Sequence, residues 1–249
     1  MAVKRSSPDG SAPTAAPTGA VEHAAALGGV VLSVLINRVY GRGRSRPLHP
    51  RGEARNASWT IDTRGPSVTG VPCLDDLGQR PCQVRHSRAV GLPSGWPDIE
   101  GVAVRLPRGS DGGGADGGMG EDTFGGDLLL AGTGDGMVSR HLLVPRWSEG
   151  TCSTLLPMRT PTGPLLVRLR PAGSDDWEIA WSRPGGDWHR VGTLTVTDEP
   201  VPEPHFEPVD SPPHGLEHYP VAALLRRPSY AQARRQAGLA DADDPVPME

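Results

Sequence analysis

Residues 83–106 read QVRHSRAVGLPSGWPDIEGVAVRL and set a pattern that much of the chain repeats. Two short valine-containing segments, 83–90 and 101–106, flank a loop of Gly, Pro, Ser and Asp. Short β-branched segments bounded by such residues are typical of strands. We expect further strands of this kind at 57–62, 127–131, 165–170, 177–181 and 191–197. Several short strands at this spacing predict an antiparallel sandwich or barrel.

Composition limits both the fold and the partners. The 249 residues include 33 glycines and 27 prolines, and only 36% are hydrophobic, which argues against a helical bundle. The length suits one large domain or two small ones. The formal net charge of −4 argues against a nucleic-acid partner, because proteins that bind nucleic acid carry excess cations to neutralise phosphates.

The chain divides into three parts. Residues 1–20 are too poor in large apolar side chains to repay the entropy of ordering, and residues 239–249 are acidic, so we expect disordered tails at both ends. Residues 21–238 are expected to form a single domain. Within it, segments 21–40 and 220–238 are expected to be helices that flank the strands, which makes the predicted class α+β.

Neither a membrane segment nor a cysteine framework is expected. The longest apolar run, residues 24–36, falls short of the roughly 20 residues that span a bilayer. Polar sequence precedes it and no small-x-small cleavage site follows it, so we predict a cytoplasmic protein. Cys73, Cys82 and Cys152 lack C-x-x-C spacing, and an odd number cannot all pair within one chain.

A cluster of arginines precedes the first expected strand. It runs from Arg38 to Arg55 and is opposed nearby only by Glu53. The cluster fits a solvated loop that leads into the strand. It also fits an anionic surface or the carboxylates of a bound ligand, because guanidinium forks pair well with both.

No single segment carries a self-sufficient catalytic signature, but several short motifs occur in an informative order. LHPRG (48–52) leads toward the first strand, VRHS (84–87) follows, and then come PDIEGVAVRL (97–106) and GDLL (126–129). This order resembles the core of the catalase superfamily. In that family an H-x-x-G motif leads into the first barrel strand, R-F-S lies on the next, and a D-x-R-G-F-A-x-K-F segment and a D-L-V strand follow. The resemblance covers about a third of the chain.

The resemblance implies a catalase-like antiparallel β-barrel that binds haem b and acts on peroxide or another small molecule. Carried onto this sequence, His49 would be the distal acid/base and Ser87 would hold its ring. Arg85 would pair with a haem propionate. Tyr230 would be the axial ligand of the haem iron, and Arg226, four residues earlier, would lower the pKa of the phenol.

The sequence departs from the family pattern at several positions. Residues 130–133, LAGT, stand where the family has a distal asparagine, His86 replaces the phenylalanine of R-F-S, and Glu100 replaces an arginine. Two alternatives therefore stay open. One is a cofactor-free descendant of the fold that binds a small molecule or a protein. The other is phosphodiester hydrolysis, a label that stand-alone chains resembling this one sometimes carry.

Overall fold

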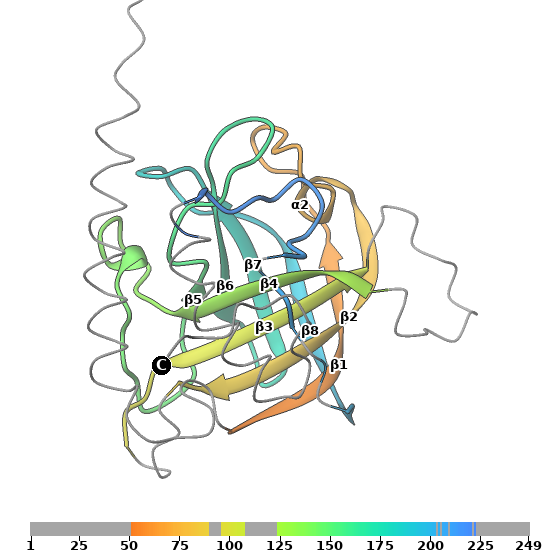
Figure 1. Cartoon of the computed structure of the whole chain (residues 1–249), viewed down its shortest axis with the longest axis vertical. Helices are drawn as coiled ribbons and strands as arrows, with labels where there is room; N and C mark the ends of the chain where they lie inside the picture. The colour runs from red at the N-terminus through yellow and green to blue at the C-terminus, as the bar shows by residue number, and fades with distance from the viewer. Residues whose placement is uncertain are drawn as a thin grey trace, which may run out of the picture.

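The computed structural model describes residues 51–89, 96–107, 124–202, 204, 206–208, 210–220 and 222. They form a closed barrel of antiparallel strands in which each strand pairs with its sequence neighbours and the last pairs back with the first (Figure 1). The strands are β1 (Arg51–Ile61), β2 (Gly78–Arg88), β3 (Glu100–Pro107), β4 (Phe124–Gly132), β5 (Cys152–Ser153), β6 (Leu166–Pro171), β7 (Asp176–Ser182) and β8 (His189–Pro200).

The predicted antiparallel barrel is confirmed, and each of the seven expected strands is present. β5 was not expected, because two residues are too short to show an alternating pattern. The α+β class is not supported. The helices with both ends in the described part of the chain are a four-residue α2 (Pro72–Asp75) and a three-residue 3₁₀ turn, η2 (Ser139–His141), and Pro220 and Ala222 are also helical.

Several predictions fall on residues that the structure does not describe. These are the two tails, the helix expected at 21–40 and nearly all of the helix expected at 220–238. The division into domains therefore stays a prediction. Among the described residues, no helix combines the length and the apolar character needed to cross a bilayer.

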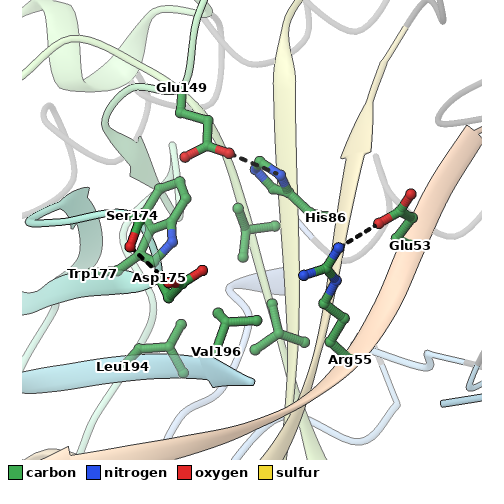
Figure 2. A pocket seen from close by; sticks show the side chains of 11 residues that line it. Glu53, Arg55, His86, Glu149, Ser174, Asp175, Trp177, Leu194 and Val196 are labelled. Carbon is green, nitrogen blue, oxygen red and sulfur yellow. Dashed lines mark hydrogen bonds and ion pairs between the residues drawn. The ribbon is translucent and has the colours of Figure 1, made fainter. Parts of the chain in front are cut away.

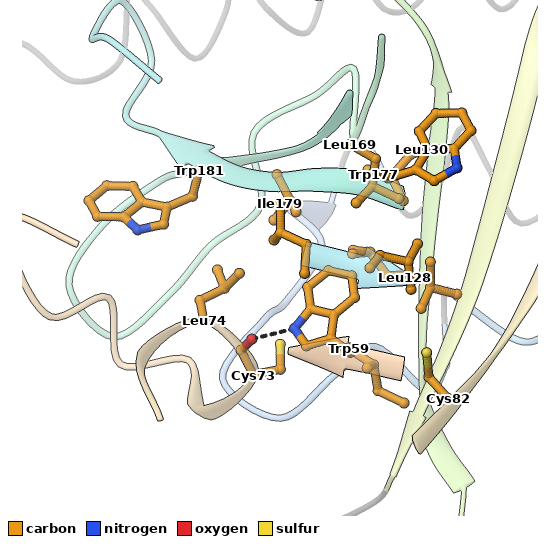
Figure 3. Close-up of a cluster of buried hydrophobic side chains, with 14 of the residues drawn as sticks. Trp59, Cys73, Leu74, Cys82, Leu128, Leu130, Leu169, Trp177, Ile179 and Trp181 are labelled. Atoms are coloured by element: carbon orange, nitrogen blue, oxygen red, sulfur yellow. Dashed lines mark hydrogen bonds between the residues drawn. The ribbon is translucent and has the colours of Figure 1, made fainter. Parts of the chain in front are cut away.

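The barrel interior is the hydrophobic core. Side chains alternate between the two faces of a strand, so every second residue of each strand points inward. Trp59 of β1 and Trp181 of β7 are almost completely buried, and the indole N–H of Trp59 donates a 2.7 Å hydrogen bond to the Cys73 carbonyl (Figure 3). This contact ties α2 to the core near the end of β1.

Some of the described residues after β8 lie on the outside of the barrel. The backbone N–H of Asp127 in β4 donates to the Ser211 carbonyl at 2.7 Å, and the Arg105 guanidinium lies 5.0 Å from the Phe206 ring centre. Asp127 also forms a two-point ion pair with Arg105, at 2.8 and 2.9 Å. These contacts hold the segment 206–211 against the outer face of β3 and β4.

Candidate functional site

Two of the predicted site residues, Arg85 and Ser87, lie on the outer face of β2. They are two positions apart and so point the same way, opposite to Val84, which belongs to the core. Both are buried. Their cross-strand partners on β1 and β3 are all small: Gly52, Ala54, Gly101 and Ala103.

Arg85 packs over a glycine. A Cβ atom added to Gly52 would lie 2.6 Å from the guanidinium carbon of Arg85 and 2.8 Å from the His86 carbonyl oxygen. The side chain of Arg85 therefore occupies the space that any larger residue at position 52 would fill. Ser87 is fixed as well, because its hydroxyl donates a 3.1 Å hydrogen bond to the Gly101 carbonyl.

This outer face fits a planar, acidic cofactor such as haem in two respects. Its glycine and alanine neighbours add little side-chain bulk, and a guanidinium fork is well suited to carboxylates such as propionates. The structure differs from the catalase pattern near the expected position of the distal asparagine. Thr133, near the position expected for the distal asparagine, is fully buried and its hydroxyl donates to Ser153 at 3.0 Å.

The other three predicted site residues, His49, Arg226 and Tyr230, lie outside the described residues. Their roles stay predictions. His49 precedes β1 by two residues, and β1 pairs Gly52 with Ser87. The first described residues after His49 therefore lie beside Ser87, its expected partner.

A second group of polar residues lies inside one end of the barrel, which we call the barrel mouth. It surrounds a cavity of about 190 Å³ (Figure 2). The lining residues come from β1, β2, β3, β7, β8 and two loops, and they are Glu53, Arg55, Val84, His86, Val102, Glu149, Ser174, Asp175, Trp177, Leu194 and Val196.

His86 and two glutamates form the most concentrated charge in the barrel mouth. Nε2 of His86 lies 2.5 Å from Oε1 of Glu100, and Nδ1 lies 3.9 Å from Oε1 of Glu149. Burial lowers the pKa of the imidazole, but the carboxylate of Glu100, followed by those of Glu149 and Glu53, outweighs burial and raises the pKa above 6.5. The ring of Trp177 packs edge-on at 5.5 Å.

A cysteine lies beside this group. Burial, aided by the charge of Glu100, raises the pKa of the Cys152 thiol well above its ordinary value. The thiol is therefore protonated and neutral near pH 7, and it behaves as a small apolar side chain.

Arg55 also belongs to the barrel mouth. It was expected in a loop leading into the first strand, but β1 begins at Arg51, so Arg55 is a strand residue whose side chain lines the cavity. Its guanidinium pairs with Glu53 at 3.0 Å and with Asp198 of β8 at 3.4 Å. The cluster from Arg38 to Pro50 lies outside the described residues.

Sequence reasoning noted His86 and Glu100 only as departures from a family motif, and it did not single out Glu149. The available signal was strand alternation, since positions 84 and 86 must point the same way once β2 is recognised. Glu149 had no such signal. It reaches the barrel mouth from the loop before β5, and its place depends on tertiary contacts.

Comparisons with known proteins bear on the fold. No protein-family model matches the chain, and no curated protein sequence matches it either. A solved structure of a bacterial catalase matches with a TM-score of 0.51 and 13% identity, over 86% of this chain and 61% of that one. A fungal catalase matches with a TM-score of 0.52 and 13% identity, over 83% of this chain and 62% of that one.

These likenesses agree with the eight-stranded antiparallel barrel described above. The chain spans a little over three fifths of the length of the two catalases. At 13% identity, the comparison supports a likeness of fold and nothing further. The protein has a catalase-like β-barrel.

Proposed function

We propose that this protein binds haem b on the outer face of β2 and uses it to consume peroxide. The observation that carries the proposal is the placement of Arg85 and Ser87 together on one buried face among glycine and alanine neighbours. Both residues match the motif that resembles the catalase family, and the barrel that presents them is catalase-like. When bound, haem supplies an iron centre that reacts with peroxide.

The residues of this chain have distinct proposed roles around that group. Arg85 pairs with a propionate through its guanidinium fork. Tyr230 would hold the iron as a phenolate, and Arg226 would favour that charged form of the phenol by proximity. Gly52 leaves room for Arg85 to lie flat on the sheet.

In the proposed reaction, His49 transfers the proton and Ser87 positions His49. His49 would take a proton from one peroxide oxygen and deliver it to the other as the O–O bond breaks, with the two electrons for that cleavage coming from the bound haem. Ser87 is a positioning residue that holds the imidazole of His49 in the orientation that both transfers need. The hydrogen bond from Ser87 to the Gly101 carbonyl supports this role, because it fixes the hydroxyl on the strand.

Haem titration of the purified full-length chain, followed by absorption spectroscopy, tests the proposal. We expect a Soret band that saturates at one haem per chain and that changes position in Tyr230→Phe. Arg85→Ala should weaken haem binding about 10-fold or more, as for loss of a charged hydrogen bond. Arg55→Ala is the matched control, because that arginine lies inside the barrel and should leave haem binding unchanged.

Activity provides a second readout. His49→Ala should still bind haem but should lose peroxide consumption by a factor of about 10²–10⁴, the usual range for a general acid/base. A spectrum that shows only the tryptophan band after haem titration would overturn the proposal. The cofactor-free alternative would then be preferred, and Thr133, which supplies no amide near the expected position of the asparagine, already favours that alternative.

A further inference from the structure

We propose that the barrel mouth binds a divalent first-row metal ion through His86, Glu100 and Glu149. This site is separate from the proposed haem face, because His86 points into the barrel while Arg85 and Ser87, its neighbours in β2, point outward. It is built in part from the residues that depart from the catalase pattern. The proposal therefore stands or falls independently of haem binding.

The three side chains already converge. One potential ligand atom from each residue lies within 4.8 Å of the other two. Metal bonds of about 2.0–2.2 Å to nitrogen and oxygen place neighbouring ligand atoms roughly 3–4 Å apart. His86 Nε2 and Glu100 Oε1, now 2.5 Å apart, must open to this spacing around an ion. Glu149 must move closer, which it can do because its side chain is 53% exposed in a loop.

Glu100 is positioned as a ligand by the loop itself. Its side chain is 11% exposed, and its Oε2 accepts a 2.9 Å hydrogen bond from the Gly150 backbone N–H. That contact leaves Oε1 directed at His86. It also fixes the residue next to Glu149 in the chain, so one hydrogen bond brings both carboxylates to the imidazole.

The imidazole provides an independent observation. Nε2 of His86 is buried, and Oε1 of Glu100, 2.5 Å away, pairs with it at an angle that is poor for a hydrogen bond. Buried polar atoms nearly always have hydrogen-bond partners, so one without a well-aligned partner needs an explanation. A metal ion that accepts the nitrogen lone pair and pairs with both carboxylates satisfies this atom.

The surroundings determine the kind of ion. One imidazole nitrogen and two carboxylate oxygens suit Zn²⁺, Mn²⁺ or Fe²⁺, whereas Ca²⁺ prefers oxygen ligands alone. The carboxylate of Asp175 also lines the cavity and favours a cation, whereas that of Glu53 is paired with Arg55 in the same lining. The cavity of about 190 Å³ holds several waters at about 30 Å³ each, enough to complete the coordination of an open site.

Calorimetric titration with Zn²⁺ tests the proposal on the untagged full-length chain after treatment with a chelator. We expect one site per chain. His86→Ala and Glu100→Gln should each weaken binding by at least the roughly 10–100-fold that loss of an outer-sphere partner causes. Matched controls are His214→Gln and Glu217→Gln, which change the same residue types at exposed positions away from the cavity and should bind Zn²⁺ as the wild type does.

A third variant serves as the control for loss of folding. Glu149→Gln alters an exposed loop side chain, so the barrel should keep its thermal unfolding midpoint while Zn²⁺ binding weakens. Mn²⁺ binding followed by electron paramagnetic resonance should lose its protein-bound signal in the same variants. Absence of a one-to-one site in the wild type, or Zn²⁺ binding that survives His86→Ala and Glu149→Gln unchanged, would overturn the proposal.

Discussion

Arg85 and His86 are consecutive residues of β2 and serve opposite sides of the barrel wall. The guanidinium of Arg85 lies outside, over Gly52, while the imidazole of His86 lies inside, 2.5 Å from Glu100. The strand therefore separates two polar sites by the thickness of one sheet. A substitution on one face of β2 thus makes no direct contact with the site on the other face.

The packing of Arg85 on Gly52 predicts the effect of a single methyl group. Gly52→Ala places a Cβ 2.6 Å from the guanidinium carbon and 2.8 Å from a backbone oxygen, so the side chain of Arg85 must move. We expect the free energy of unfolding to fall by about 1–3 kcal/mol in urea denaturation. Gly173→Ala is the control, because its Cβ would make only an ordinary 3.7 Å contact. Equal stability of the two variants would contradict the described packing.

Closure of the barrel depends on Gly192 in β8. A Cβ there would lie 1.9 Å from the carbonyl oxygen of Thr60 in β1, and the backbone cannot yield without separating the two strands. Gly192→Ala should therefore cost at least about 3 kcal/mol, the upper part of the range for overpacking. Thermal unfolding followed by tryptophan fluorescence measures the loss. A melting temperature near that of the wild type would show that β1 and β8 do not pair in this register.

The ion pair between Arg105 and Asp127 holds the segment that follows β8. Asp127 is 2% exposed, and it also accepts a hydrogen bond from the Glu207 N–H. Asp127→Ala should cost about 3–5 kcal/mol, because it leaves a guanidinium in a largely buried place without its carboxylate. Limited proteolysis should then cut near residues 206–211 faster than in the wild type.

An exposed ion pair supplies the comparison. Asp62 and Arg190 pair at 2.6 Å with both side chains about two fifths exposed, so Asp62→Ala should cost at most about 1 kcal/mol. It should leave cleavage near residue 207 unchanged. Similar losses of stability in the two variants would contradict the burial that distinguishes them.

The raised pKa of His86 predicts a pH dependence of stability in metal-free protein. The folded state binds the imidazole proton more tightly than the unfolded chain, for which the pKa is near 6.5. The stabilisation is complete below that value and is lost as the pH rises through the higher pKa of the folded state. The advantage of the wild type over His86→Gln in the free energy of unfolding should thus shrink as the pH rises.

Urea denaturation between pH 5 and 9 in the presence of a chelator measures this difference. In a Glu100→Gln background the pH dependence due to His86 should be smaller, because the nearest carboxylate charge is gone. An advantage of the wild type that grows with pH would mean that burial, rather than Glu100, dominates the pKa of His86.

The local sequence was enough to predict the strands and much of the face pattern. Alternation at 83–88 identifies β2 and already separates Arg85 and Ser87 from Val84, because a two-residue period is built into an extended chain. Gly and Pro at 91–97 predict a loop after it. The two-residue β5 gave no such signal, and the start of β1 was predicted six residues too late because Arg51, Glu53 and Arg55 are charged.

The tertiary structure alone decided which residues share the barrel mouth. Glu100 and Glu149 are far from His86 in the sequence, and they meet it because β2 pairs with β3 and because the Gly150 N–H binds Glu100. The physical reason is that a side chain's face follows from local geometry, whereas the register between strands and the closure of the barrel depend on contacts across the whole fold. The sequence by itself thus determined the strands and the alternation that puts Arg85 and Ser87 on one face of β2, and the tertiary structure determined the closure of the barrel and the site on the other face.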